Sequence, residues 1–213
     1  MPTTPPPIYT KPADISPDTL ANLGPLRALA GVWQGTIGAD DHPNASGSKD
    51  QVFLERYEAQ PIDPQTNGPQ LFYGLRYHTH ITKPGKVGTF HDQVGYWLWE
   101  PATGTVTLTI AIPRGQVMLA AGQCEAKATT FTVTADLGAA DYGICSNPFL
   151  AANFTTTAFA MTVTANPDGT WGYQEDTTMT IAGRSEPFQH TDHNTLSLVS
   201  PPTPNPLAQS TQA

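Results

Sequence analysis

The chain has 213 residues, of which 13% are charged and 38% are hydrophobic. This length suits one sizeable domain, or one domain with tails at its ends. The net charge of −8 and the pI near 5.0 argue against nucleic acid and anionic membranes as partners. No apolar run is long enough to span a membrane and no signal region opens the chain, so we expect a cytoplasmic protein.

The two ends of the chain differ in character from its middle. Residues 1–17 and 200–213 are rich in proline and lack apolar periodicity, which predicts flexible tails around a single domain at residues 18–199. At the start of this domain, closely spaced leucines predict one short helix, which Gly24 and Pro25 interrupt.

From Gly31 onward the apolar residues follow a period of two. Val106, Leu108 and Ile110, for example, alternate with threonines, as expected for strands with one buried face. Short turns separate about ten such strands, near residues 31–38, 51–59, 70–81, 88–99, 104–112, 115–123, 129–136, 154–165, 170–181 and 187–199. A meander of this length usually closes to remove its edges. We therefore predict an all-β fold, a ten-stranded antiparallel up-and-down β-barrel that binds a small apolar or amphipathic ligand.

The last predicted strand carries two histidines, His190 and His193. Alternation groups His190 with the apolar Phe188 and Leu196, and places His193 on the opposite face. His190 is therefore the candidate metal ligand inside the barrel, and a bulge would promote His193 instead. The other interpretation of His190 is structural, with its ring hydrogen-bonded to a carbonyl or to a carboxylate such as Asp192.

A basic stripe lies on the third predicted strand, where Arg76, His78 and His80 share one face. The simplest interpretation is a solvated outer face. If the stripe faces inward, Arg76 and a histidine are candidates to hold a carboxylate or a haem propionate. Arg114, in a turn at a barrel rim, is a second candidate for an anionic head group. A zinc site at the His-x-His pair is a third interpretation.

Several segments together resemble the nitrobindins and related bacterial haem-binding β-barrel proteins, over about residues 24–199. The resemblance depends on the start Gly31-Val32-Trp33-Gln34-Gly35, on Gly95-Tyr96-Trp97, on Ile112-Pro113-Arg114-Gly115, and on the closing stretch from Met179 to Leu198. The chain is most similar to a longer branch of that family, because it carries additional segments at residues 61–69 and 138–153.

The resemblance implies a ten-stranded barrel with haem b held by one histidine of the last strand, and nitric oxide binding or peroxynitrite isomerase-like activity. The Pro187-Phe188-Gln189-His190 segment is one residue shorter than the family's pattern. A gap before the histidine assigns His190 as the iron ligand, whereas alignment from Leu196 assigns His193. A homodimer through an outer face is compatible with such a barrel.

Three functional hypotheses follow. The first is a haem protein with His190 as the axial ligand and Arg76 or Arg114 near the propionates. The second is a non-enzymatic carrier or sensor of a fatty-acid-like molecule, paired through one of these arginines. In the third, the barrel's own side chains fill its interior, with Trp97, Trp99, Trp171, Phe159 and Met161 as the candidates. Motifs for hydrolytic or hydride-transfer chemistry are absent from the sequence.

Overall fold

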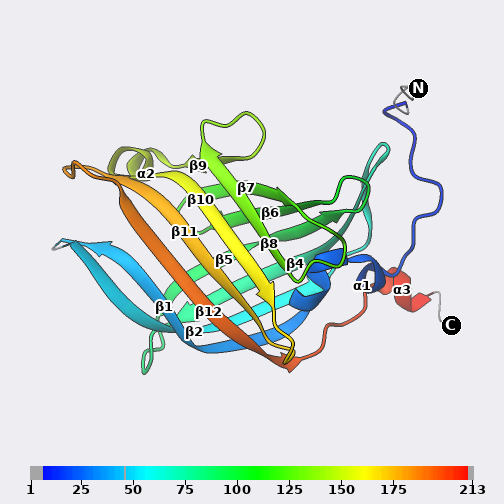
Figure 1. The fold of residues 1–213 in the computed structure, drawn as a ribbon, viewed down its shortest axis with the longest axis horizontal. Helices are drawn as coiled ribbons and strands as arrows, with labels where there is room; N and C mark the ends of the chain where they lie inside the picture. Colours follow the sequence, from blue (N-terminus) through cyan, green and yellow to red (C-terminus); the bar gives the residue numbers. More distant parts are fainter. Residues whose placement is uncertain (1–6, 46, 211–213) are drawn as a thin grey trace.

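The protein forms a closed β-barrel, seen in a computed structural model that describes residues 7–45 and 47–210 (Figure 1). Eleven strands make the ring in the order β2-β1-β12-β11-β10-β8-β9-β7-β6-β5-β4, and pairing of β2 with β4 closes it. The strands of the described chain are β1 Gly31–Asn44, β2 Gly47–Pro61, β3 Gln65–Asn67, β4 Gln70–Thr82, β5 Thr89–Glu100, β6 Thr105–Ile112, β7 Gln116–Gln123, β8 Thr130–Leu137, β9 Gly143–Ser146, β10 Phe154–Ala165, β11 Trp171–Ile181 and β12 Phe188–Ser200.

The ten long strands match the ten that the alternation predicts, and all pairs between them are antiparallel. The difference is the eleventh strand, β9, which lies in the segment at residues 138–153. β9 pairs with one end of β7 and, in parallel, with the end of β8, where the direct contact between β7 and β8 shrinks to Ala121 opposite Thr134. The insert therefore completes the barrel wall there.

One end of the barrel carries the helical segments near the two ends of the chain, and the tips of the β1–β2 and β11–β12 hairpins mark the other end, where helix α2 (Pro148–Asn153) also lies (Figure 1). Helix α1 (Thr19–Asn22) and the 3-10 helix η1 (Gly24–Leu29) form the predicted short helical segment, broken at Gly24 and Pro25. Leu23, Leu26 and Leu29 are fully buried there and belong to the same core cluster as Trp33 and Trp99. This helical end of the barrel is thus closed by apolar side chains.

The segment after Ser200 also packs at the closed end, although its sequence predicts a flexible tail. Asn205 is only 1% exposed, and its side-chain amide donates hydrogen bonds to Pro17 O and Asp63 Oδ1, both at 2.9 Å. The short helix α3 (Pro206–Ser210) follows. Residues 1–6 and 211–213 of the predicted tails lie outside the described residues. No helix among the described residues is long and apolar enough to cross a membrane.

We expect Leu26→Ala to lower the free energy of unfolding by about 2–5 kcal/mol, because it removes fully buried methyl groups from the closed end. Urea denaturation followed by circular dichroism measures this change. The control is Leu207→Ala on α3, where the side chain is 48% exposed and a change within about 0.5 kcal/mol is expected. Equal losses in both variants would contradict the assignment of the core.

Candidate functional site

A cavity of about 230 Å³ lies inside the barrel toward its open end. Inward-facing residues of eight strands line it, with an aromatic floor toward the closed end of the barrel and a polar upper wall toward the open end. Its lining residues are Asp40, His42, Phe53, Glu55, Tyr57, Tyr77, Thr79, Ile81, Phe90, His91, Gln93, Trp97, Leu108, Arg114, Met161, Trp171, Tyr173, Glu175, His190 and Asp192. Neither the segment at 61–69 nor that at 138–153 appears among them, so the two inserts leave this cavity open.

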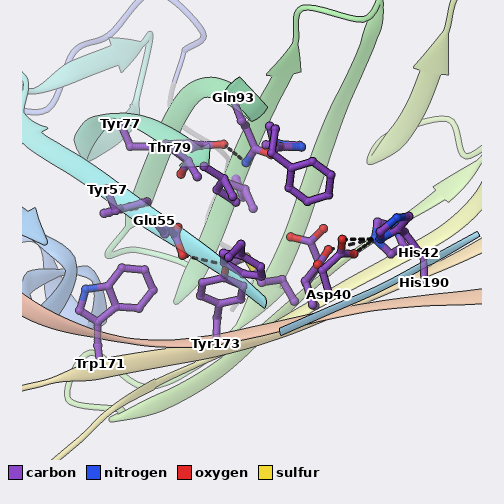
Figure 2. A pocket seen from close by; sticks show the side chains of 18 of the residues that line it. Asp40, His42, Glu55, Tyr57, Tyr77, Thr79, Gln93, Trp171, Tyr173 and His190 are labelled. Carbon is purple, nitrogen blue, oxygen red and sulfur yellow. Dashed lines mark hydrogen bonds and ion pairs between the residues drawn. The ribbon is translucent and has the colours of Figure 1, made fainter. Parts of the chain in front are cut away.

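Aromatic rings form the floor of the cavity (Figure 2). Tyr57 stacks on Tyr77 with ring centroids 5.7 Å apart, and meets Trp171 edge-on at 4.9 Å. The indole Nε1 of Trp97 donates a hydrogen bond of 3.0 Å to the Tyr57 hydroxyl. These large side chains fill the barrel toward its closed end. The third hypothesis, in which the barrel's own side chains fill its interior, therefore holds for this part only. The space above them accounts for the cavity.

A buried glutamate stands next to this floor. Glu55 on β2 is 3% exposed, and its Oε2 accepts hydrogen bonds from the Tyr173 hydroxyl at 2.9 Å and from the Asn194 amide at 2.8 Å. Burial raises the pKa of Glu55 to about 7, although both hydrogen bonds act in the opposite direction. Near neutral pH this carboxyl group therefore retains a proton in part of the molecules, and a neutral acid can donate a hydrogen bond as well as accept one.

A cluster of two histidines and two aspartates forms the upper wall (Figure 2). The Nε2 of His190 lies 2.8 Å from Asp40 Oδ1 and 3.3 Å from Asp192 Oδ2. The Nδ1 of His42 lies 2.7 Å from the other oxygen of Asp40. Burial opposes ionisation of Asp40, but hydrogen bonds from His190 and Asp192 outweigh it and lower the pKa of Asp40. Asp40 is thus the anion that holds both imidazole rings.

The remaining acids of this wall favour their protonated forms. Burial, followed by the negative charges of Glu175 and Asp40, raises the pKa of Asp192 well above its ordinary value. Burial likewise raises the pKa of Glu175 to about 7. Because carboxylates close together cannot all ionise cheaply, the wall binds protons when no cation is present.

At the mouth of the cavity, a chain of hydrogen bonds leads from Arg114 down to the floor. Arg114 donates to His91 Nδ1 at 3.2 Å, and His91 Nε2 donates to Gln93 Oε1 at 3.2 Å. The Gln93 amide then donates to the Tyr77 hydroxyl at 2.8 Å, which donates to Thr109 O at 3.1 Å. Burial, with the charge of Arg114, lowers the pKa of His91, so its imidazole is neutral in this chain.

The residues that the sequence analysis proposes for the site fall into two groups, one inside the barrel and one on its outer face. His190 and Arg114 line the cavity, whereas His193 is exposed on the outside of β12. Arg76, His78 and His80 do not line it: they lie on the outer face of β4, where His78 contacts Asp92 at 3.1 Å and His80 contacts Thr89 at 3.1 Å. Their neighbours Tyr77, Thr79 and Ile81 face inward instead. A ligand inside the barrel therefore meets Arg114 and not Arg76.

Sequence reasoning missed four polar residues of the wall: Asp40, His42, Glu55 and Glu175. For Glu55 the signal was present, since it occupies an inward position between Phe53 and Tyr57 on the same strand. For Asp40 it was not, because β1 is longer than its apolar pattern indicates and carries a bulge between Gly35 and Gly38. The bulge reverses the alternation and turns Asp40 and His42 into the barrel.

A family model described as "THAP4-like, heme-binding beta-barrel domain" matches residues 22–197. Among solved structures, the chain is similar to the crystal structure of Rv2717c from M. tuberculosis, with a TM-score of 0.52 and 20% sequence identity. That likeness covers 85% of this chain and 98% of the other, and at this identity it supports the fold alone. The search of curated proteins gave no match.

We expect the buried Glu55 to make stability depend on pH. A carboxyl group whose pKa is about 7 when folded and 4.5 when free stabilises the fold fully below pH 4.5. This contribution is lost as the pH rises to about 7, by up to about 3 kcal/mol. Glu55→Gln should therefore lose less stability than the wild type between pH 4.5 and pH 8, as measured by urea denaturation at each pH.

The matched control is Glu58→Gln on the same strand, because the Glu58 side chain is 37% exposed. It should retain the pH dependence of the wild type. If Glu55→Gln loses as much stability between the two pH values as the wild type does, Glu55 is not the buried acid that the structure indicates.

Proposed function

The chain belongs to the family of THAP4-like, haem-binding β-barrel domains, and from this membership we propose that it binds haem b at the open end of its barrel, with His190 as the axial iron ligand. The observation that carries the proposal is the position of His190. Among the histidines of the last strand, it is the one on the cavity wall, and neutral imidazole is a common iron ligand.

The residues around the mouth fit a haem group in their chemistry. Arg114 offers a guanidinium that suits the carboxylate of a propionate, and Phe90 supplies an aromatic ring next to it on the same cavity wall. Asp40 lies within hydrogen-bond distance of the His190 ring, and a carboxylate is the usual partner of the ring nitrogen that does not bind the metal. When bound, haem supplies an iron centre that takes a small ligand such as nitric oxide.

Two features set conditions on this binding. The cavity of about 230 Å³ is smaller than the roughly 300–1,000 Å³ of sites for drug-sized ligands, so a porphyrin has to occupy the open end and not the floor. In addition, Nε2 of His190 is engaged by Asp40 at 2.8 Å. Iron has to replace this hydrogen bond, or the ring has to turn, at a cost of about 1.5–3 kcal/mol. We therefore infer a weaker affinity than in a barrel whose histidine is free.

The alternative, a carrier of fatty-acid-like molecules, has less support. Arg114 at the mouth suits an anionic head group, but the wall beneath it carries Asp40, Glu175 and Asp192. An apolar chain that enters the barrel has to pass these acids, and burying them against hydrocarbon is unfavourable. Arg76, the other arginine proposed for this role, is on the outer face.

Titration of the protein with haemin tests the proposal. We expect a sharp Soret band for the wild type, loss of this band in His190→Ala, and its retention in His193→Ala, whose side chain is exposed. Haemin at about 100 times its dissociation constant should raise the free energy of unfolding by about 2.7 kcal/mol. A Soret band that survives in His190→Ala, or that disappears in His193→Ala alone, would refute the assignment of the ligand.

Arg114→Gln tests the propionate contact separately. Because a guanidinium and a carboxylate form a charge-assisted pair at the exposed mouth, we expect the variant to bind haemin about 5- to 10-fold more weakly, equivalent to about 1 kcal/mol. Arg76→Gln is the matched control on the outer face and should leave the affinity unchanged. The same titration measures both, and equal effects would contradict a role for Arg114.

A further inference from the structure

Three acidic residues occupy directly opposed positions on three neighbouring strands of the barrel. Asp40 on β1 pairs with Asp192 on β12, and Asp192 pairs with Glu175 on β11. All three line the cavity. Directly opposed residues in an antiparallel sheet have Cβ atoms about 4.5–5.5 Å apart, and like charges there are destabilising. A row of this kind is stable when it holds protons or binds a positively charged species.

Within the described chain, the compensation comes from histidines and not from lysine or arginine. The ion pairs of Asp40 and Asp192 are those with His190 and His42. Arg114, which shares the cavity, contacts His91 instead. The Glu175 side chain has no hydrogen-bond partner among the described residues, although it faces the same cavity. The wall thus lacks a fixed cation of its own.

The donor atoms converge as in a coordination shell. One nitrogen of His190 and one oxygen each from Asp40 and Asp192 lie within 4.8 Å of one another, and Figure 2 shows His190 directed at Asp40. The Nε2 to oxygen distances are 2.8 and 3.3 Å. With metal-to-ligand bonds of about 2.0–2.2 Å, neighbouring donors in such a shell lie roughly 3.0–3.5 Å apart. Small shifts of the two carboxylates are enough to admit an ion.

The cluster is also enclosed, unlike an ordinary acidic surface patch. The side chain of Asp40 is 4% exposed, that of Asp192 is 21% exposed and that of His190 is 27% exposed. From behind, His42 Nδ1 holds the second oxygen of Asp40 at 2.7 Å, the way an outer partner orients a ligating group. One side of the cluster remains open to the cavity.

We propose that Asp40, His190 and Asp192 bind one divalent transition-metal ion, with Zn²⁺ as the representative of this class. One imidazole and two carboxylates suit Zn²⁺, Mn²⁺ or Fe²⁺. Glu175 or water takes the position on the cavity side, which is the arrangement of a site with three protein ligands and one open position. The site does not depend on haem binding. Because both use His190, the metal ion and haem iron exclude each other.

Calorimetric titration of the metal-free, untagged full chain with Zn²⁺ tests the proposal, and Co²⁺ absorption spectra report on the ligands. One ion should bind per chain. Asp192→Asn should weaken binding by more than the roughly 10- to 100-fold that is typical for loss of an outer partner, and His42→Ala should weaken it within that range. His190→Ala should abolish the Co²⁺ spectrum. Thermal melts of each variant confirm that it is folded, and Asp192→Asn, which keeps the shape of an acid whose charged form burial disfavours, should melt no lower than the wild type.

His78→Ala and His193→Ala are the matched controls, since both residues are histidines outside the barrel and His78 contacts Asp92. Each should bind Zn²⁺ as the wild type does. Full binding by Asp192→Asn would overturn the proposed set of ligands. Loss of binding in His78→Ala would overturn it too, and would assign the ion to the outer face of β4. Haemin binding and Zn²⁺ binding are followed in separate titrations of the wild type, the first by the Soret band and the second by calorimetry, so a failure of one proposal is distinguished from a failure of the other.

Discussion

The contact between His190 and Asp40 joins the last strand of the barrel to the first, across 150 residues of sequence. It is a charge-assisted hydrogen bond in a partly buried setting, where such bonds are stronger than neutral ones. It holds the imidazole at the cavity wall, keeps Asp40 ionised and, through the second oxygen of Asp40, positions His42. The direction of the ring at the cavity wall therefore depends on an acid of the neighbouring strand.

This contact also divides the barrel interior into two regions. Below it, Tyr57, Trp97 and Trp171 pack into a floor that continues into the apolar closed end. Above it, acids and histidines face the opening, and Arg114 stands at the rim. Glu55 lies at the boundary, where burial among aromatic rings raises its pKa but two hydrogen bonds stabilise its charged form. A ligand thus enters through a polar mouth and meets an apolar end.

The sequence predicts the barrel better than it predicts this interior. Alternating apolar residues and turns are local signals, and they locate all ten long strands and the inward direction of His190. The bulge of β1 between Gly35 and Gly38 has no local signal, so the inward direction of Asp40 and His42 was missed. Likewise, Glu55 is stabilised inside by Asn194, 139 residues away, and such a partner emerges only when the ring closes. Long-range pairing, not propensity, determines the chemistry of the site.

The pairing of β12 with β1 and β11 also places the acids next to His190, and these acids affect which cation binds there. In the two proposals, a divalent ion and haem iron would both use a ring nitrogen of His190, so each would displace the other in proportion to its concentration and affinity. A small ion bound there would keep both carboxylates as partners. Haem iron bound at Nε2 would instead replace the contact with Asp40 and leave two acids to be satisfied by other groups. The acidic row on β1, β12 and β11 therefore favours a small cation at the His190 ring. Membership in a haem-binding family favours haem iron at the same ring, so the two preferences are opposed.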